Sequence, residues 1–457
     1  MTATTVEAAR PEFSLGYRRW MFTLLVAVYT CSFLDRVIVN TVGPAIIQDL
    51  GLSDFEFGLL GGAAFALFYA AFGLPIAWLA ERFSRVNIIA VCIALWSAMT
   101  AMSGLAPNYA QLLIYRMGVG VGEGGCSPAA HSLLSDHYPS TKRASALALY
   151  SLGVPLGAML GAIGGGWIAQ TFDWRTAFIA LGLPGLILAL LVRLTLREPA
   201  RGRQETDPAA AKAKAAPLRA VVARLLMSRS FPSLCAGFVL TNLTASAVNA
   251  FAPTYLVRAF HLGLAETGLL YGLVYGVSGV IGMLIGGFGA DAAGKHDARW
   301  YVWAPAIGSL IAMPVYVLAF TQPSAMATAV LFFVGGVMTS FYFAPTMAVV
   351  HNLVEPRMRA TAAAVMFLLI NIFGQGVGPT AMGAVSDFIG KQMLAPGTAF
   401  SLCPAGADAP EFVATACAAP LAVGLRWSIL AMTVFCLLGA VFFFRAARFI
   451  RQDLARR

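Results

Sequence analysis

Hydrophobic and polar residues follow one another along this chain in long blocks. Apolar runs recur from Trp20 to about Phe444, and short polar segments separate them. Each run is close to the roughly 20 residues that an α-helix needs to cross the hydrocarbon core of a bilayer. The pattern predicts twelve membrane-spanning helices, at residues 19–45, 54–80, 87–105, 108–136, 142–170, 175–196, 230–258, 264–291, 299–319, 324–352, 358–388 and 422–447.

One internal polar segment, residues 197–229, is much longer than the others and divides the spans six and six. We therefore expect an N-terminal bundle at 1–196, a linker at 197–229 and a C-terminal bundle at 230–457. The halves also resemble each other, because Gly58-Leu59-Leu60 in the second span matches Gly268-Leu269-Leu270 in the eighth. Parallel repeats of this kind place a substrate site between the halves, near the bilayer midplane.

The basic residues indicate how the chain is oriented. One set of loops holds most of them: Arg82, Arg85, Lys142, Arg143, the linker, Lys295, Arg299, Arg357, Arg359 and the tail from Arg445. The opposite loops carry mainly acids: Asp49, Asp54, Glu56, Asp173, Asp408 and Glu411. The positive-inside rule then predicts a multi-pass inner-membrane protein with both termini in the cytoplasm.

Composition excludes several other classes. The chain is 59% hydrophobic and 11% charged, whereas soluble domains are about 25% charged. Its net charge of +10 belongs to loops beside the spans, so we expect no nucleic-acid partner. The seven Cys form no metal-ligand pattern, and no phosphate-binding Gly-rich loop ending in Lys-Ser or Lys-Thr occurs, so we expect no metal, no cofactor and no direct use of ATP.

Two cysteines differ from the rest because they share one polar loop. Cys403 and Cys417 follow the eleventh predicted span, whereas the others lie mostly inside spans. A disulfide between them requires that this loop face an oxidising compartment. The sequence leaves that question open.

Two opposite charges stand near the middle of the first span, in Phe33-Leu34-Asp35-Arg36. An ionisable side chain at that depth costs about 2.5–3.5 kcal/mol on insertion scales, so it normally faces a bundle interior and needs a partner. The fourth span carries a second such pair, Arg116 and Glu123, which share one helix face. These four side chains are the candidate centre of the molecule.

We expect Arg36 to pair with Glu123 and Asp35 with Arg116, or all four to share one network. A buried carboxylate separated from its partner gains proton affinity, whereas arginine keeps its proton. Asp35 and Glu123 are therefore the candidate proton-coupling residues, while Arg36 and Arg116 are candidates for holding an anionic substrate group. The alternative is a static ion-pair cluster, although buried ion pairs are poor stabilising devices.

Other polar and aromatic side chains also fall inside the spans. Ser127 and His131 lie one turn apart in the fourth span, and His131 is either a proton relay or an ordinary packed residue. The second half has no mid-span charge but offers amides and rings: Asn242, Asn249, Tyr275, Phe341 and Asn371. One charged half facing one neutral, aromatic half suits an amphipathic substrate.

The loop between the second and third predicted spans, from Ala77 to Arg85, reads Ala-Trp-Leu-Ala-Glu-Arg-Phe-Ser-Arg. It resembles the Gly-x-Leu-Ala-Asp-Arg-x-Gly-Arg pattern of the major facilitator superfamily, with both glycines replaced and Glu81 in place of Asp. The resemblance to that family covers nearly the whole chain. A second copy runs from Gly287 to Lys295. The resemblance implies the twelve-helix, two-bundle, all-α fold of that family. It also implies a cytoplasmic gating cluster made by the charged motif residues: Glu81, Arg82, Arg85, Asp291 and Lys295.

A narrower resemblance is to the spinster branch of that family. It rests on the Asp35-Arg36 pair and on the segment from Arg116 to Gly124, which is followed by Ser127-Pro128 and Ser135-Asp136. That branch includes exporters of lysolipids and sphingosine phosphate. The resemblance implies a proton-coupled, alternating-access transporter for an amphipathic organic anion or lysolipid-like molecule, acting as a monomer among membrane lipids.

Three other functions are open to a helical membrane protein. A proton-driven exporter of drugs or small organic anions would have the same fold. An intramembrane enzyme would need a nucleophile, a base and a positioned acid, and beside Ser127 and His131 no such acid is evident. A channel would need a symmetric ring of filter residues, which a two-fold repeat lacks. We therefore expect a transporter and not an enzyme.

Overall fold

The structure is a computed structural model of the chain. It describes residues 13–200, 217–355, 358–394, 403 and 411–455, apart from the side chains of residues 140, 141, 144, 360 and 411–415. Every regular element in this part of the chain is a helix. The predicted all-α class is confirmed.

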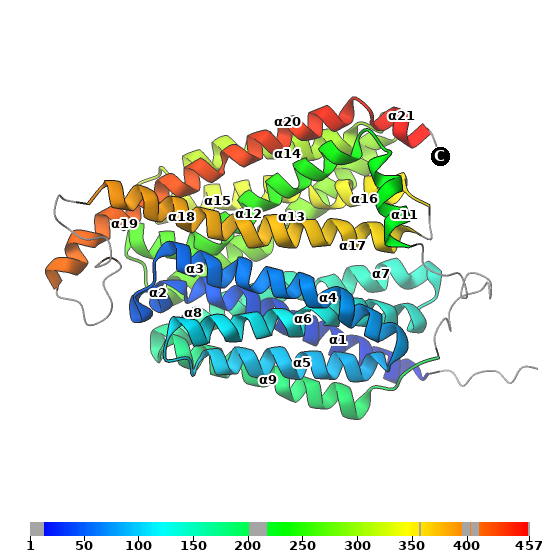
Figure 1. Cartoon of the computed structure of the whole chain (residues 1–457), viewed down its shortest axis with the longest axis horizontal. Helices are drawn as coiled ribbons and strands as arrows, with labels where there is room; N and C mark the ends of the chain where they lie inside the picture. Colours follow the sequence, from blue (N-terminus) through cyan, green and yellow to red (C-terminus); the bar gives the residue numbers. More distant parts are fainter. Residues whose placement is uncertain (1–12, 201–216, 356–357, 395–402, 404–410, 456–457) are drawn as a thin grey trace, which may run out of the picture.

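The helices of the first half lie together in the lower part of Figure 1. They are α1 (Leu15–Thr41), α2 (Gly43–Leu50), α3 (Asp54–Gly61), α4 (Ala63–Arg82), α5 (Arg85–Ser103), α6 (Tyr109–His137), α7 (Ser140–Ser151), α8 (Gly153–Thr171) and α9 (Trp174–Thr195).

The helices of the second half lie in the upper part of the same view. They are α11 (Leu218–Leu226), α12 (Phe231–Phe260), α13 (Leu264–Gly294), α14 (Trp300–Ala319), α15 (Ala325–Ser340), α16 (Phe343–Leu353), α17 (Arg359–Leu369), the π-helix η2 (Ile370–Gly376), α18 (Val377–Gln392), α19 (Glu411–Met432), α20 (Val434–Ala447) and α21 (Ile450–Ala455).

Eleven helical segments among the described residues are long and apolar enough to cross a membrane. The one predicted span outside that set is the fourth, which corresponds to α6, because its charged residues and glycines lower its hydropathy. It is nevertheless a 29-residue helix that packs against α4 and α5. The predicted twelve-helix fold is therefore confirmed, and the span outside the apolar set is α6, which carries Arg116 and Glu123.

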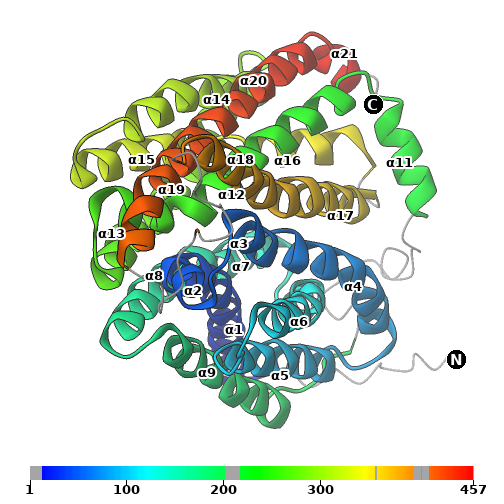
Figure 2. The same ribbon diagram turned by 60° about the vertical axis from the view of Figure 1, so that its left-hand side comes forward.

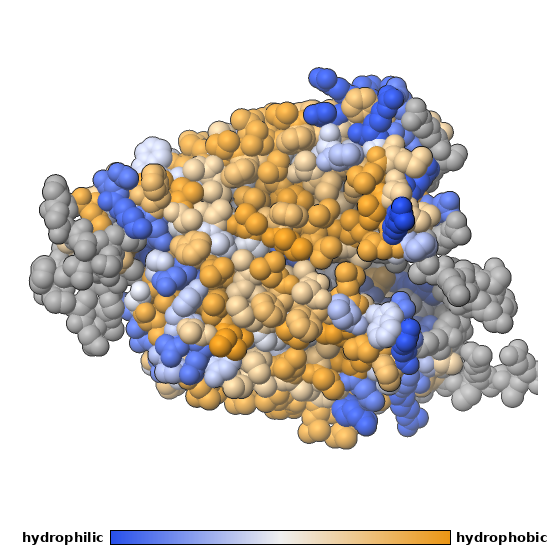
Figure 3. Space-filling view, viewed as in Figure 1, coloured by the Kyte–Doolittle hydropathy of each residue, from blue (hydrophilic) through white to orange (hydrophobic). Residues whose placement is uncertain are grey.

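The two halves lie side by side along their length, as Figures 1 and 2 show. One end of the molecule carries α21, α11 and the start of α1, and we call it the termini end. The opposite end carries α2, α3 and the start of α19, and we call it the loop end. Figure 3 shows a broad hydrophobic flank between two more polar ends, which is the surface expected of a protein embedded in a bilayer.

Small residues let the helices of the two halves approach closely. Gly166 of α8 packs against the Leu264 carbonyl at the start of α13, and Gly268 of α13 packs against the Ala162 carbonyl of α8. On its other side α8 meets α1, where Gly157 contacts the Thr30 carbonyl. The glycines of the fifth span therefore do what small-residue motifs do in membranes, which is to permit close backbone contact.

The structure departs from the predicted spans at several points. The second span is broken at Gly62, whose backbone (φ −108°, ψ −96°) is not helical, so α3 and α4 are separate helices. The eleventh span contains the π-helix η2. The twelfth begins at Glu411 instead of residue 422, and the linker contains a short helix, α11.

Cys403 and Cys417 are joined by a disulfide at the loop end. The bond ties Cys403 of the polar loop to α19.

Candidate functional site

Four charged side chains meet in the core of the first half. Asp35 and Arg36 come from α1, and Arg116 and Glu123 come from α6. Asp35, Arg116 and Glu123 are 1%, 2% and 1% exposed. Glycines let α6 lie close to its neighbours: Gly120 packs on backbone atoms of Phe65 and Tyr69 in α4, and Gly122 on Trp96 in α5.

Arg36 and Glu123 form the predicted ion pair. The Arg36 Nε donates to Glu123 Oε2 at 2.5 Å, and Ser32 Oγ donates to the same oxygen at 3.0 Å. The Arg36 guanidinium also lies 4.9–5.0 Å from the ring centroids of three aromatic residues, Phe33, Phe65 and Tyr69. The Arg36 side chain is 18% exposed while that of Glu123 is 0% exposed, so the arginine is the more accessible member of the pair.

Asp35 and Arg116 do not pair as predicted. Arg116 Nη1 donates to the main-chain oxygen of Asp35 at 3.4 Å and not to its carboxylate. That carboxylate accepts from Thr100 Oγ1 at 3.2 Å, and its Oδ1 has no hydrogen-bond partner. Arg116 Nε and Glu123 Oε1 are likewise buried without partners. The cluster therefore has unused donor and acceptor capacity, which a structural ion-pair network would normally fill.

His131 and Ser127 lie further along α6, toward the termini end. The His131 side chain is exposed, and Ser127 is half-buried. The imidazole meets the ring of Tyr150 edge-on at 5.5 Å, and Tyr150 stacks on Tyr29 of α1 at 4.4 Å. His131 is thus on an accessible surface of the same helix that holds Glu123, next to an aromatic stack.

The corresponding region of the second half is neutral. Asn242 of α12 donates to the Tyr342 hydroxyl at 2.7 Å, and Ser246 donates to the Gly374 carbonyl of η2 at 2.7 Å. Asn371 donates to the Phe367 carbonyl at 2.7 Å, within its own helix. Asn242 Oδ1 remains buried without a partner. Tyr342 was not among the predicted site residues, and its hydroxyl is the group that holds Asn242.

Three other predicted residues of the second half surround this region. Tyr275 stacks on Tyr271 at 5.5 Å and lies within electrostatic reach of Arg36 in the first half. Phe341 is half-buried, and its backbone packs against Gly286 of α13. Asn249 is half-buried in α12. Because α12 and α13 of the second half both contact α1 of the first, the neutral region lies next to the helix that carries Asp35 and Arg36.

The predicted gating residues fall at the termini end, but only Arg85 is buried there. Its Nη1 donates to Asp136 at 2.5 Å and its Nε donates to Glu198 at 2.6 Å. Glu198 also accepts from the backbone N–H of Val86 at 3.1 Å. Partial burial acts to raise the pKa of Glu198, but these hydrogen bonds outweigh it and hold that pKa below its usual value.

The other gating residues make local contacts. Glu81 is exposed, and the Arg82 guanidinium lies 3.8 Å from the ring centroid of Trp78. Asp291 accepts from the Tyr301 hydroxyl at 2.9 Å, and Lys295 is the residue that follows α13. Sequence reasoning did not assign Asp136 or Glu198 to the gating cluster. Asp136 entered only through the narrower spinster resemblance, and Glu198 belongs to the polar linker.

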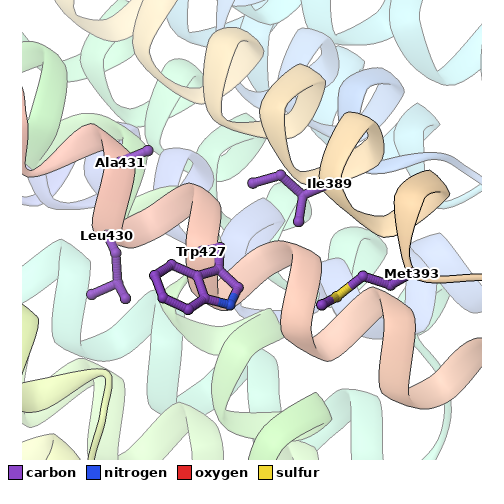
Figure 4. A pocket seen from close by; sticks show the side chains of 5 residues that line it. All are labelled: Ile389, Met393, Trp427, Leu430 and Ala431. Carbon is purple, nitrogen blue, oxygen red and sulfur yellow. The ribbon is translucent and has the colours of Figure 1, made fainter.

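A shallow apolar cavity of about 550 Å³ lies elsewhere, on the flank of α18 and α19 (Figure 4). Its walls are Ile389, Met393, Trp427, Leu430 and Ala431. The Trp427 side chain, at 53% exposed, borders it. The cavity contains none of the buried charges and faces the apolar flank, so it is not the candidate site.

Comparisons with known proteins agree with this architecture. A family model described as Major Facilitator Superfamily matches residues 25–379. An "MFS-type efflux pump" of Mycolicibacterium smegmatis is 34% identical over 371 residues, covering 80% of this chain and 83% of that protein. "Protein spinster homolog 1" of Xenopus tropicalis is 26% identical over 460 residues, covering 97% of this chain and 83% of that protein.

A solved structure gives the same result in three dimensions. It is a crystal structure of a bacterial homologue of the human lysosomal transporter Spinster, in an inward-facing and unoccupied conformation. The two chains superpose with a TM-score of 0.86 and share 32% identity, over 96% of this chain and 99% of that one.

Proposed function

The chain belongs to the Major Facilitator Superfamily and is a multi-pass membrane transporter, not an enzyme, and we propose that it couples proton movement to the transport of an amphipathic organic anion. The observation that carries the proposal is the buried cluster of Asp35, Arg36, Arg116 and Glu123. Two acids and two arginines balance in charge, yet three of their polar atoms lack partners. A proton or an anion can therefore change the bonding of the cluster.

In this proposal Arg36 exchanges one anionic partner, Glu123, for another, the anionic group of the substrate. Arg36 cannot release its proton, so it always needs an anion beside it, and in this structure that anion is Glu123. When Glu123 takes up a proton, Arg36 is free to bind an anionic group of the substrate. When that proton leaves, Glu123 again competes for Arg36 and displaces the substrate. Proton and anion then bind together, and the anion follows the proton gradient.

Asp35 is the second proposed proton site. Its carboxylate has one hydroxyl partner, Thr100, and one free oxygen in a buried position. An ionised carboxylate with so little solvation is costly, so a proton at Asp35 is favoured when Arg116 stays on the backbone. A movement of α6 that brings Arg116 to the carboxylate would release that proton.

The neutral half would receive the rest of the substrate. Tyr275 belongs to α13, which contacts α1, and the Asn242–Tyr342 pair lies in the same half. Phe341, Asn371 and Asn249 complete this surface in the proposal, with Ser127 and His131 on the accessible side of α6. A charged head group at Arg36 and an apolar tail along these rings define an amphipathic anion, such as a lysolipid.

We further propose an inner-membrane location with the termini end in the cytoplasm. The basic residues of α7, α11 and α21 gather at that end. The Cys403–Cys417 disulfide is at the loop end, as expected if that end faces an oxidising compartment. The gating residues would then act on the cytoplasmic side, with one chain as the working unit and residues 197–229 joining the two bundles.

The 34% identity with an efflux pump favours one alternative, a proton-driven exporter of drugs or small organic anions. An exporter driven by protons must move its substrate against the direction of proton flow. Our proposal predicts movement in the same direction, so the two functions differ in the sign of coupling.

The test uses purified protein in proteoliposomes with a panel of labelled lysolipids. We expect an inward proton gradient to drive uptake of an anionic lysolipid and an outward gradient to drive its release. Glu123→Gln should lower gradient-driven uptake at least ten-fold. Uptake driven by the opposite gradient would identify the exporter, and native coupling in Asp35→Asn and Glu123→Gln chains would refute the proton sites. If native protein moves no lysolipid, the substrate class is wrong.

A further inference from the structure

The N-terminus of α3, at the loop end, is completed by the other half of the molecule. The first N–H groups of a helix have no partner within it. Ser53 and Glu56 form a capping box that uses two of them, at 3.2 and 2.9 Å. The N–H groups of Asp54 and Phe55 remain, and they donate to Asp387 Oδ1 and Oδ2 at 3.0 and 2.9 Å. Asp387 belongs to α18, so one carboxylate of the second half serves a helix of the first.

The Asp54 side chain makes the reverse connection. Both terminal nitrogens of Arg258, at the end of α12, donate to its carboxylate at 2.8 Å. Ser386 of α18 donates to the same carboxylate at 2.6 Å. We call Asp54, Arg258, Ser386 and Asp387 the α3–α18 cluster. Bidentate and charge-assisted bonds of this kind are the strong ones.

The residues of the α3–α18 cluster are largely buried, which strengthens the electrostatic attraction between them. Asp54, Ser386 and Asp387 are 1%, 2% and 7% exposed, and the Arg258 side chain is 14% exposed. Water and salt therefore screen the cluster little. Separation of the halves at this end would expose or leave unpaired two carboxylates, one guanidinium and two N–H groups at once.

The backbones of α3 and α18 are in direct contact. Gly58 of α3 packs directly on the Pro379 carbonyl, and Gly383 of α18 packs on the Asp54 carbonyl. Thr380 Oγ1 donates to the Gly58 carbonyl at 3.2 Å. As a result α3 packs more extensively on α18 than on any helix of its own half. A side chain at either glycine would hold the two helices apart.

We propose that α3 is a gate segment and that the α3–α18 cluster holds the loop end of the transporter closed. At the termini end the described ion pairs of Arg85 and Arg451 instead stay on one side: Arg85 binds Asp136 and the linker residue Glu198, and Arg451 binds Asp297 of its own half. The state favoured by the cluster is therefore closed at the loop end. This inference uses only membership of the transporter family and does not depend on the substrate or on proton coupling.

Distances between spin labels test the proposal. One pair, at Gln48 and Ser324, reports the loop end, and a second pair, at Ser145 and Ala223, reports the termini end; all four side chains are exposed. Cys31 and Cys235, the half-buried free cysteines, are replaced by Ser. In the chain with an intact cluster we expect a short loop-end distance as the main population.

Asp387→Ala should increase the population with a long loop-end distance at least ten-fold and shorten the termini-end distance in the same molecules. A ten-fold shift corresponds to about 1.4 kcal/mol, and two charge-assisted bonds supply at least that much. Asp387→Asn and Arg258→Lys should shift the same populations by smaller factors, and they replace Asp387→Ala if that chain does not fold.

The matched control is Asp49→Ala, which breaks an ion pair with Arg175 at the same end but inside the first half. It should leave both distance distributions unchanged. Native distributions in folded Asp387 and Arg258 variants would overturn the proposal. Loss of transport without any change in distance would also overturn it, because the cluster would then act on something other than the gate.

Discussion

The two halves have the same architecture but different chemistry in their cores. The first half holds four ionisable groups in its core, which are Asp35, Arg36, Arg116 and Glu123. The second half buries neutral pairs in comparable helices, such as Thr241 with Ser309 at 3.0 Å and Asn242 with Tyr342 at 2.7 Å. The two halves therefore share one scaffold but differ in the groups that they bury at its centre, which are ionisable in the first half and neutral in the second.

This difference indicates what each half is for. A neutral buried hydrogen bond stabilises a protein by about 0.5–1.5 kcal/mol, whereas a buried ion pair gains little because desolvation offsets its attraction. The neutral hydrogen bonds thus stabilise the fold, whereas the charged cluster adds little net stability. The cluster is better explained by an exchange of partners during transport.

The largest expected effect comes from removing one charge of the cluster. Arg36→Ala leaves Glu123 buried without its cation, which costs about 3–5 kcal/mol, and it removes the proposed anion site. We expect a lower midpoint of thermal unfolding in detergent and no measurable transport.

The double variant Arg36→Ala with Glu123→Ala separates these two effects. It should recover most of the lost stability, because no uncompensated charge remains, yet transport should stay absent. Recovery of transport by the double variant would show that the ion pair is structural.

A smaller effect is expected in the neutral half. Tyr342→Phe leaves the Asn242 amide without its partner, at a cost of about 1–3 kcal/mol. Because the charged cluster is untouched, we expect proton coupling to remain and the KM for substrate to rise a few-fold.

Tyr316→Phe is the matched control for that variant. It breaks the buried bond to Thr339 at 3.1 Å in the same half, outside the proposed substrate surface. Its unfolding midpoint should fall by a similar amount with the KM unchanged. Equal KM changes in both variants would remove Tyr342 from the substrate site.

Sequence patterns predicted the features that are local or repeated. The lengths of the apolar runs predicted the spans, and the charged residues near mid-span predicted the Arg36–Glu123 pair. The direct Asp35–Arg116 pair, one of the two expected arrangements, was wrong because an arginine can also bond to a backbone carbonyl, and sequence spacing does not distinguish the two. Asp54 and Asp387 were missed because they lie 333 residues apart and each looks like an ordinary polar helix end.

The smallest effect is expected at a charge outside the membrane. Glu198 is bound by Arg85 and by the Val86 N–H, and its pKa is held below its usual value. Its side chain is 30% exposed, so solvent screening limits its contribution to less than about 1 kcal/mol.

The sign of the pH dependence follows from that lowered pKa. The stabilisation is present above the pKa that Glu198 has in the unfolded chain, and it is lost as pH falls through the folded value. Thermal unfolding of the native and Glu198→Gln chains should therefore differ at pH 7 and converge in acid. A difference that grows in acid would contradict this assignment.

The most direct test of proton coupling by the buried cluster compares two kinds of transport in one Asp35→Asn preparation. Exchange of labelled for unlabelled substrate needs alternating access but no net proton movement, whereas accumulation driven by a pH gradient needs both. We predict that Asp35→Asn keeps exchange near the native rate and loses accumulation at least ten-fold. If the variant accumulates substrate as the native protein does, or loses both activities together while folded, the cluster does not couple protons to transport.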